Sequence, residues 1–316
     1  MNRSLPNLTV HQLIYVRAAA SAPTLAIAAE ALGVSQPALS QGLAEVERRL
    51  GAPLFDRRGR TRVPTPALSA VVDVAQRVLA AVDDLDRFLA EMSTGTRGSL
   101  RVGMIDTAAL GEYARPLARF REEQPNVHTT LRVEGSVSLC EQVVDGRLDM
   151  AIAVTPNAVL ERHADQLSVI ELASEPLMIY VPRAKQSMPL AGVGPWVSFP
   201  AGSQTRTLIT RALAGRGIHM DVSAESSNPD VLRQMVRLGV GSCVLPRSIG
   251  EGGSDPLESF EMVPLTTRTL GLLRRRDQLP NPAAERLAAG IGAVAVAARR
   301  NRGGASGNKR TAPPRR

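Results

Sequence analysis

The sequence contains two cysteines and four histidines, and this scarcity limits the chemistry that it can carry. Cys140 and Cys243 stand far apart without a paired spacing, which indicates neither a disulfide framework nor a zinc site. The histidines are also isolated from one another and give no pair with the spacing of metal ligands. We therefore expect no metal and no cofactor. The four histidines are His11, His128, His163 and His219.

Long hydrophobic runs are also missing. The longest nearly apolar segment is Leu287–Ala298, whereas a helix that crosses a bilayer needs ~20 such residues. The first ten residues lack the apolar centre of a secretory signal. We expect a protein without a membrane segment that works in the cytoplasm.

No local signature of catalysis is present. The chain has no G-x-S-x-G nucleophile elbow, no P-loop and no G-x-G-x-x-G that opens a helix after a strand. Serine, histidine and aspartate occur, but residue type without a local arrangement does not indicate a reaction. We therefore expect no enzyme, although an enzyme is the main alternative for the α/β body described below.

Charge is unevenly placed along the 316 residues, a length that favours two or three domains. Residues 1–65 hold eight arginines against four acidic residues, and the stretch 299–316 holds seven basic residues and no acid. The long central part is nearly neutral. A basic head on a neutral body indicates that nucleic acid meets the N-terminal part, and an ordinary solvated surface is the alternative.

The N-terminal part has the pattern of a helix-turn-helix. Leu13, Val16 and Ala20 recur at helical spacing, and a second helix is expected from a Thr24 cap to Gly33. A third helix follows, with Ser35 as its cap, Pro37 in its first turn and Gly51 at its end. In a helix-turn-helix, the second of the two helices enters the major groove of DNA. The stripe that this helix buries is Leu39, Leu43, Val46 and Leu50.

Polar and basic side chains accompany this third helix. Gln36, Ser40 and Gln41 lie on its polar face, and such side chains can hydrogen bond to base edges. They can equally be ordinary surface residues. The segment Asp56–Arg62 then places four arginines around a turn glycine, as in a β wing that contacts phosphates.

A long amphipathic helix is expected to begin at Thr65-Pro66. Its apolar residues recur in steps of three and four through Leu79 to Met92, and Asp73, Asp83, Asp84 and Arg87 are expected on its wet side. One apolar stripe on a lone helix needs a partner, and a second copy of the chain is the simplest. Packing against its own body is the alternative.

Beyond a polar linker at 93–98, strand and helix patterns alternate. Such alternation indicates parallel sheets that are covered on both faces, and a break at Glu171–Pro176 indicates two α/β lobes. The arginine-rich, glycine-rich end is expected to be disordered. The expected parts are a DNA-binding head (1–65), a dimerising linker helix with a hinge (66–97), a two-lobed α/β body (98–298) and a basic tail (299–316).

The residues also resemble a known family. The segment Ala28–Ser40, of sequence AAEALGVSQPALS, is similar to the recognition segment of LysR-type transcription regulators. The likeness continues through Leu54-Phe55-Asp56-Arg57 and Thr65-Pro66-Ala67. The order of three segments in the body is also that expected of the family's effector domain. These segments are Gly146–Ile152, Gly239-Val240-Gly241 and Leu245-Pro246.

This resemblance implies an α/β fold with an N-terminal all-α winged helix-turn-helix and two Rossmann-like lobes resembling periplasmic binding proteins. It implies a sequence-specific regulator of transcription that binds double-stranded DNA, forms a dimer or tetramer and binds a small-molecule effector between its lobes. RNA polymerase is a further candidate partner. The DNA-reading residues would be Gln36, Pro37, Ser40 and Gln41, with Arg57, Arg60 and Arg62 directed to the DNA backbone.

The effector contacts are expected at the ends of strands and the starts of helices. Thr107 follows the first strand of the body, and Ser136 is expected to cap the helix after the second. Ser203, Gln204 and Thr205 precede a helix in the other lobe. Hydroxyls and free N–H groups at helix starts favour an anion, and a carboxylate is the expected class. Plain helix capping without a ligand is the alternative.

Three positions depart from the family pattern. Ala26 stands where a hydroxyl residue is common, Gln41 where arginine is common, and Leu68 where a glycine usually follows Thr-Pro-Ala. Two other functions remain open beside the enzyme. A solute-binding receptor would share the lobes but would need export, and a thiol redox sensor would need its two cysteines in one lobe.

Overall fold

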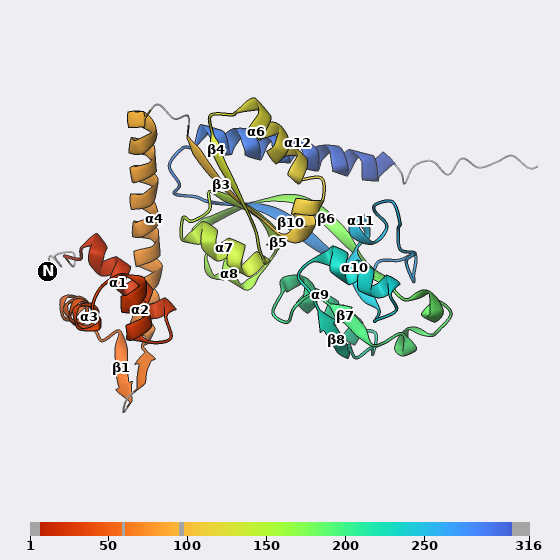
Figure 1. Ribbon diagram of the computed structural model, residues 1–316, viewed down its shortest axis with the longest axis horizontal. Helices are drawn as coiled ribbons and strands as arrows, with labels where there is room; N and C mark the ends of the chain where they lie inside the picture. Colours follow the sequence, from red (N-terminus) through yellow and green to blue (C-terminus); the bar gives the residue numbers. More distant parts are fainter. Residues whose placement is uncertain (1–6, 59–60, 95–97, 305–316) are drawn as a thin grey trace, which may run out of the picture. The chain divides into compact units, whose positions relative to one another are not determined.

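The computed structural model describes residues 7–58, 61–94 and 98–304, and the side chains of most of these (Figure 1). The chain divides into two compact units, Met1–Ser93 with Val144–Arg147 and Thr94–Val143 with Leu148–Arg316. No helix in the described ranges combines the length and the apolar character that crossing a bilayer requires.

The first unit begins with the three expected helices, α1 (Val10–Ser21), α2 (Leu25–Ala31) and α3 (Gln36–Leu50). Each has a hydroxyl cap, and the Ser35 side chain accepts a hydrogen bond from the Ala38 N–H. Helix α3 ends at Gly51, whose φ of 68° lies in the left-handed region that glycine adopts freely. The antiparallel strands β1 (Phe55–Arg58) and β2 (Thr61–Pro64) then form the wing.

A compact apolar core holds these helices together. Leu39, Leu43 and Val46 bury one face of α3 as predicted, and Val16 of α1 packs in the same cluster. Ala19 is buried rather than Ala20, which the spacing had favoured. The opposite face of α3 is therefore left for other partners.

Helix α4 (Pro66–Thr94) has two apolar faces rather than the single seam expected. Ala75 and Leu79 are buried in a cluster with Leu13 of α1, so this part of the helix packs against its own chain. The expectation that Leu79 faces a second copy is therefore wrong. Asp84, expected in solvent, is 5% exposed and paired with Arg87.

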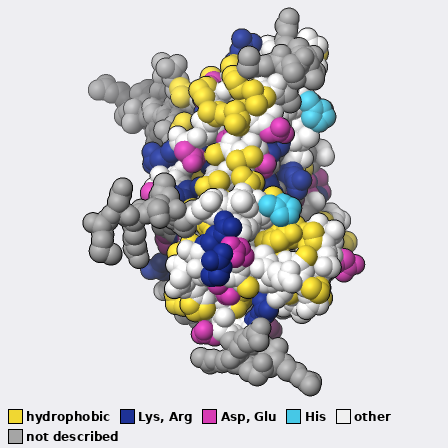
Figure 2. All heavy atoms as spheres, turned by 90° about the vertical axis from the view of Figure 1, so that its left-hand side faces the viewer, with side chains coloured by type: hydrophobic (Ala, Val, Ile, Leu, Met, Phe, Trp, Pro, Cys, Tyr) yellow, Lys and Arg dark blue, Asp and Glu magenta, His cyan; other side chains and the backbone are white. Residues whose placement is uncertain are grey.

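The second apolar face of α4 is exposed. Figure 2 looks onto this side of the molecule and shows apolar side chains gathered in its upper half, where α4 runs. Their steps of three and four residues place them along one side of the helix. We call them the α4 stripe, and they are Val74, Val78, Val82, Leu85, Phe88 and Leu89.

The second unit is built on a six-stranded sheet in the order β4-β3-β5-β10-β6-β9. Strand β3 (Ser99–Met104) lies parallel to β4 (His128–Val133) and to β5 (Met150–Thr155). Strand β10 (Thr266–Arg275) is antiparallel to β5 and β6, and β9 (Cys243–Pro246) is antiparallel to β6. The sheet is therefore mixed, and within it the predicted parallel pairing holds only for β3, β4 and β5.

Strand β6 (Leu167–Tyr180) corrects the predicted break at Glu171–Pro176. The strand continues through that segment, with one register shift opposite Leu270 and Gly271, and it pairs with β10 along its first part and with β9 at its end. Two lobes are present as expected, but β6 and β10 are shared between them. The boundary lies within paired strands rather than in a loop.

In the first lobe, helices surround β3, β4 and β5. The predicted helix over 111–123 begins later and follows a separate short helix after β3. The final helix continues to Gly304, beyond the predicted domain end at 298, and the rest of the predicted tail, 305–316, lies outside the described residues. These helices are α5 (Asp106–Leu110), α6 (Ala114–Glu123), α7 (Ser136–Val144), α8 (Ala158–Arg162) and α12 (Pro282–Gly304).

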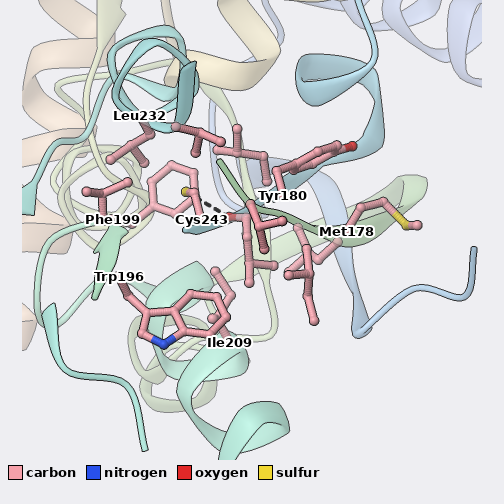
Figure 3. Packing of buried hydrophobic residues seen from close by; sticks show 14 of the residues in the cluster. Met178, Tyr180, Trp196, Phe199, Ile209, Leu232 and Cys243 are labelled. Atoms are coloured by element: carbon pink, nitrogen blue, oxygen red, sulfur yellow. Dashed lines mark hydrogen bonds between the residues drawn. The ribbon is translucent and has the colours of Figure 1, made fainter. Parts of the chain in front are cut away.

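The second lobe packs around the chain's one tryptophan. Trp196 opens β7 (Trp196–Ser198), which lies parallel to β8 (Val222–Glu225), and it lies close to Ile209 of the following helix (Figure 3). The other labelled residues of this core are Met178, Tyr180, Phe199, Leu232 and Cys243. The helices of this lobe are α9 (Gln204–Ala214), α10 (Pro229–Arg237) and α11 (Arg247–Gly250), with short turns η1 (Arg183–Lys185) and η2 (Leu190–Gly192).

Candidate functional site

The outer face of α3 presents the polar residues singled out in the sequence. Gln36, Pro37 and Gln41 are exposed, and Ser40 is half-buried at the side of the helix that faces the wing. Since the apolar residues of α3 are committed to the core, this polar face is free to enter a groove. The helix begins with a satisfied cap, which fixes the direction of its first turn.

Arg62 of the wing does not simply extend into solvent. Its Nη2 donates a hydrogen bond to the Ser40 Oγ at 3.3 Å, and its guanidinium carbon lies 5.9 Å from the centre of the Phe55 ring. The wing and α3 are thus joined by one arginine. Of the other predicted wing residues, Arg60 and the side chain of Arg57 lie outside the described residues.

A concave surface of about 580 Å³ lies between α3, the wing and the start of α2. Gln36 and Arg62 line it, together with Thr24 and Ala26. Ala26 supplies no hydroxyl to this surface. The shape and the mixture of amide and guanidinium donors suit the edge of a nucleic-acid duplex.

A second cavity, of about 430 Å³, lies between the two lobes of the second unit. We call it the interlobe pocket. It brings together all five residues predicted to contact an effector, which are Thr107, Ser136, Ser203, Gln204 and Thr205. The volume falls in the range of cavities that hold small molecules.

The predicted roles of these residues differ in detail. Ser203 caps α9, because its Oγ accepts a hydrogen bond from the Arg206 N–H at 3.1 Å. Ser136 is the first residue of α7, and its Oγ instead accepts from the Val154 N–H at 3.0 Å. The prediction that Ser136 caps its helix is therefore wrong. Its hydroxyl anchors α7 to β5 and keeps a proton for a further acceptor.

Thr107 and Thr205 share a partner that the sequence had not indicated. Arg268 of β10 is 3% exposed, and its guanidinium donates to the Thr107 Oγ1 at 2.6 Å and to the Thr205 Oγ1 at 2.9 Å. Its other donors reach Glu175 of β6 at 2.7 and 2.9 Å. One buried side chain therefore contacts both lobes and both shared strands. The only local sign was an arginine at the start of a buried strand.

Acidic residues also line the interlobe pocket. Asp106, Glu134 and Glu141 are among its lining residues. Burial raises the pKa of the Asp106 carboxyl above its usual range. The Glu134 carboxylate accepts hydrogen bonds from Ser138 Oγ and Gln142 Nε2. The pocket is therefore richer in negative than in positive charge.

Both cysteines are buried, in different lobes. Burial raises the pKa of the Cys140 thiol to about 11, and the pKa of Cys243 is raised still further by complete burial. Asn157 Nδ2 lies 3.3 Å from Cys140 Sγ. Among the described residues, no group of three or more His, Cys, Asp or Glu side chains could hold a metal ion.

Known proteins share this architecture. CbnR, a LysR family transcriptional regulator, has a TM-score of 0.57 at 19% identity over 91% of this chain and 99% of that one. A cysteine variant of full-length OxyR from Pseudomonas aeruginosa has a TM-score of 0.56 at 24% identity over 90% and 95%. At these identities the likeness concerns the fold.

Curated relatives match in sequence as well. The HTH-type transcriptional activator CmpR of Synechocystis sp. is 27% identical over 76% of this chain and 80% of its own length. The HTH-type transcriptional regulator CbbR of Xanthobacter flavus is 28% identical over 89% and 86%. These relatives are transcriptional regulators, and the matches extend over most of both chains.

Two family models match adjacent parts of the chain. Residues 10–67 match the bacterial regulatory helix-turn-helix protein, lysR family, and residues 93–295 match the LysR substrate binding domain. The matched segments coincide with the winged helix and with the two-lobed unit. The chain belongs to the LysR family and is a DNA-binding transcription regulator with an effector-binding domain.

Proposed function

We propose that the chain reads a specific DNA sequence with Gln36, Pro37, Ser40 and Gln41, and that Arg57 and Arg60 contact phosphates. The observation that carries this proposal is the exposed polar face of α3, whose apolar face is locked in the core. CbnR, which has the same fold, has been crystallised in complex with its target DNA, and this supports binding to DNA here. Arg62 acts with Ser40 at the junction of helix and wing.

The regulator works as a homo-oligomer, with the α4 stripe as the contact between two copies. Six large apolar side chains on one helical face are costly to leave in water, and a second identical helix covers them symmetrically. A dimer formed in this way carries two DNA-binding heads. A tetramer follows if two such dimers associate.

The interlobe pocket binds a small-molecule effector, with contacts from Thr107, Ser136, Ser203, Gln204 and Thr205. The N–H groups of the first turn of α9 are suited to a carboxylate group of that effector. A ligand that binds better when the lobes are closer shifts the equilibrium towards closure, and only this difference in affinity can move it. In a dimer, closure would change the spacing of the DNA-binding heads.

The chain acts by binding rather than by catalysis, and it acts in the cytoplasm, where its DNA is found. RNA polymerase is the partner through which a bound regulator would change transcription. The parts that we propose are the DNA-binding head (1–65), the linker helix with its hinge (66–97), the effector-binding body (98–298) and the basic tail (299–316), although the final helix continues past residue 298.

Selection from a random DNA library with the full-length chain tests this function. We expect one enriched motif with two related half-sites, because a dimer presents two copies of α3. The same selection with Gln36→Ala should enrich a degenerate motif. Recovery of random sequence by the wild-type chain would contradict the proposal.

A further inference from the structure

The interlobe pocket is lined by more acidic than basic side chains. Three carboxylates, those of Asp106, Glu134 and Glu141, and one guanidinium, that of Arg268, line the cavity. A ligand that enters the pocket exchanges water for these groups. The charges that remain unpaired inside the cavity therefore decide which class of molecule it accepts.

Arg268 is largely committed before any ligand arrives. Nε and Nη2 both donate to Glu175, a second Nη2 proton goes to Thr107, and Nη1 donates to Thr205. A guanidinium has five N–H donors, so one Nη1 proton is left for a ligand. Its charge is balanced by the Glu175 carboxylate beside it. A free anion would thus gain little from this arginine.

The carboxylates of the pocket, in contrast to Arg268, mostly lack a counter-ion. Within the described ranges, neither Asp106 nor Glu141 has a basic side chain within ion-pair distance. Glu134 is in part compensated, because Ser138 and Gln142 donate to it and Arg132 lies 3.9 Å away. Asp106 is half-buried, and its charge has lost part of its water without gaining a counter-ion.

We infer that the effector carries a cationic group, such as an ammonium or guanidinium, which lies against Asp106 and Glu141. The inference rests on the proposed function, because it names the ligand class of the same pocket. A carboxylate on the same molecule would be directed to the other wall, where α9 begins with Ser203 and Gln204. The pocket then favours amino-acid-like zwitterions and amines, and it disfavours molecules that carry only negative charge.

A series with one carbon skeleton tests the sign of the ligand charge. Putrescine, 4-aminobutanoate and succinate each have a four-carbon chain and differ in their terminal groups, as do cadaverine, 5-aminopentanoate and glutarate. Binding to the full-length protein is measured by isothermal titration and by the shift of the thermal midpoint. We expect the ammonium-bearing compounds to bind with Kd values of about 1 mM or tighter and the dicarboxylates to bind at least tenfold more weakly.

Two variants connect the selectivity to named residues. Asp106→Asn should weaken binding of the ammonium-bearing compounds roughly 10- to 100-fold, since one charge-assisted contact is lost. Asp165→Asn, at an exposed turn of the first lobe, is the matched control and should leave the titrations unchanged. Ser227→Trp, at an exposed position that lines the pocket, should block binding of every compound and so shows where they bind.

The outcomes separate this inference from the function on which it rests. Tighter binding of succinate or glutarate than of the amines would overturn the cationic class and leave an effector pocket in place. Failure of every ammonium-bearing compound to bind, or equal binding by Asp106→Asn, would also overturn it. Loss of DNA selection by the wild-type chain would instead contradict the regulator itself, and it is measured without any ligand.

Discussion

Arg268 of β10 and Glu175 of β6 form a buried ion pair, with nitrogen–oxygen distances of 2.7 and 2.9 Å. The pair lies on the two strands that both lobes share, and the same guanidinium donates to a threonine of each lobe. The lobes are therefore joined by the hydrogen bonds of a charged side chain as well as by the two strands that they share. Loss of this side chain should affect the whole second unit.

Arg268→Met should lower the free energy of unfolding of the second unit by about 3–5 kcal/mol, because it leaves the Glu175 carboxylate buried without a counter-ion. Urea unfolding followed by the fluorescence of Trp196, the only tryptophan, measures this change. The double variant Arg268→Met with Glu175→Gln should recover much of the loss. A single variant as stable as the wild type would show that the pair contributes nothing.

Arg62 should contribute to sequence reading and not only to phosphate contact. Arg62→Ala removes the donor that holds Ser40 Oγ, so we expect a loss of roughly 1–3 kcal/mol on the selected DNA site. Arg62→Lys keeps the charge and should restore binding to random DNA more than binding to the selected site. Arg48→Ala, at an arginine that pairs with Glu45, is the control and should leave the preference for the selected site unchanged. A loss of the same size on both DNAs in Arg62→Ala, restored equally on both by Arg62→Lys, would argue for a simple phosphate contact.

The two faces of α4 should respond differently to a charge. Leu85→Asp, in the exposed α4 stripe, should separate the oligomer while the helix content and thermal midpoint of the isolated chain stay close to those of the wild type. Leu79→Asp buries an unpaired carboxylate against α1 and should destabilise the first unit by several kcal/mol. Sedimentation velocity and circular dichroism distinguish the two results. An intact oligomer in Leu85→Asp would place the interface elsewhere.

The two thiols should be unreactive in the folded protein. With the pKa of Cys140 raised to about 11, roughly a thousandth or less of this thiol is thiolate at pH 8, and Cys243 is more strongly protonated. We expect an aromatic disulfide reagent to react with neither cysteine until denaturant is added. Rapid reaction of one thiol in the native protein would revive a redox role.

Local signals in the sequence were sufficient to predict where the helices of the first unit begin and end. Thr24, Ser35 and Gly51 act on their own helices through caps and a left-handed turn, and these contacts span only a few residues. The structure confirms each of these boundaries. Five residues that line the interlobe pocket were also predicted, because strand ends and helix starts converge at one edge in an α/β fold, whereas its acidic residues and Arg268 were not.

Other features depend on contacts that are distant in the sequence. Arg268 and Thr107 are 161 positions apart, and no periodicity links them. The long helix α4 carries apolar residues on two faces, and Leu79 is buried within the chain because it packs in a cluster with Leu13 of α1. Strand β6 was divided in the prediction because Glu171, Ser174 and Glu175 interrupt its apolar pattern, whereas pairing with β10 continues through them.

The most direct test of the account is a competition titration of the full-length chain between its selected site and random DNA of the same length. We expect the wild type to prefer the selected site by roughly a thousandfold or more at physiological salt. Gln36→Ala should lose roughly 1–3 kcal/mol on the selected site and almost nothing on random DNA. Equal loss on both DNAs, or no preference in the wild type, would contradict the claim that α3 reads sequence.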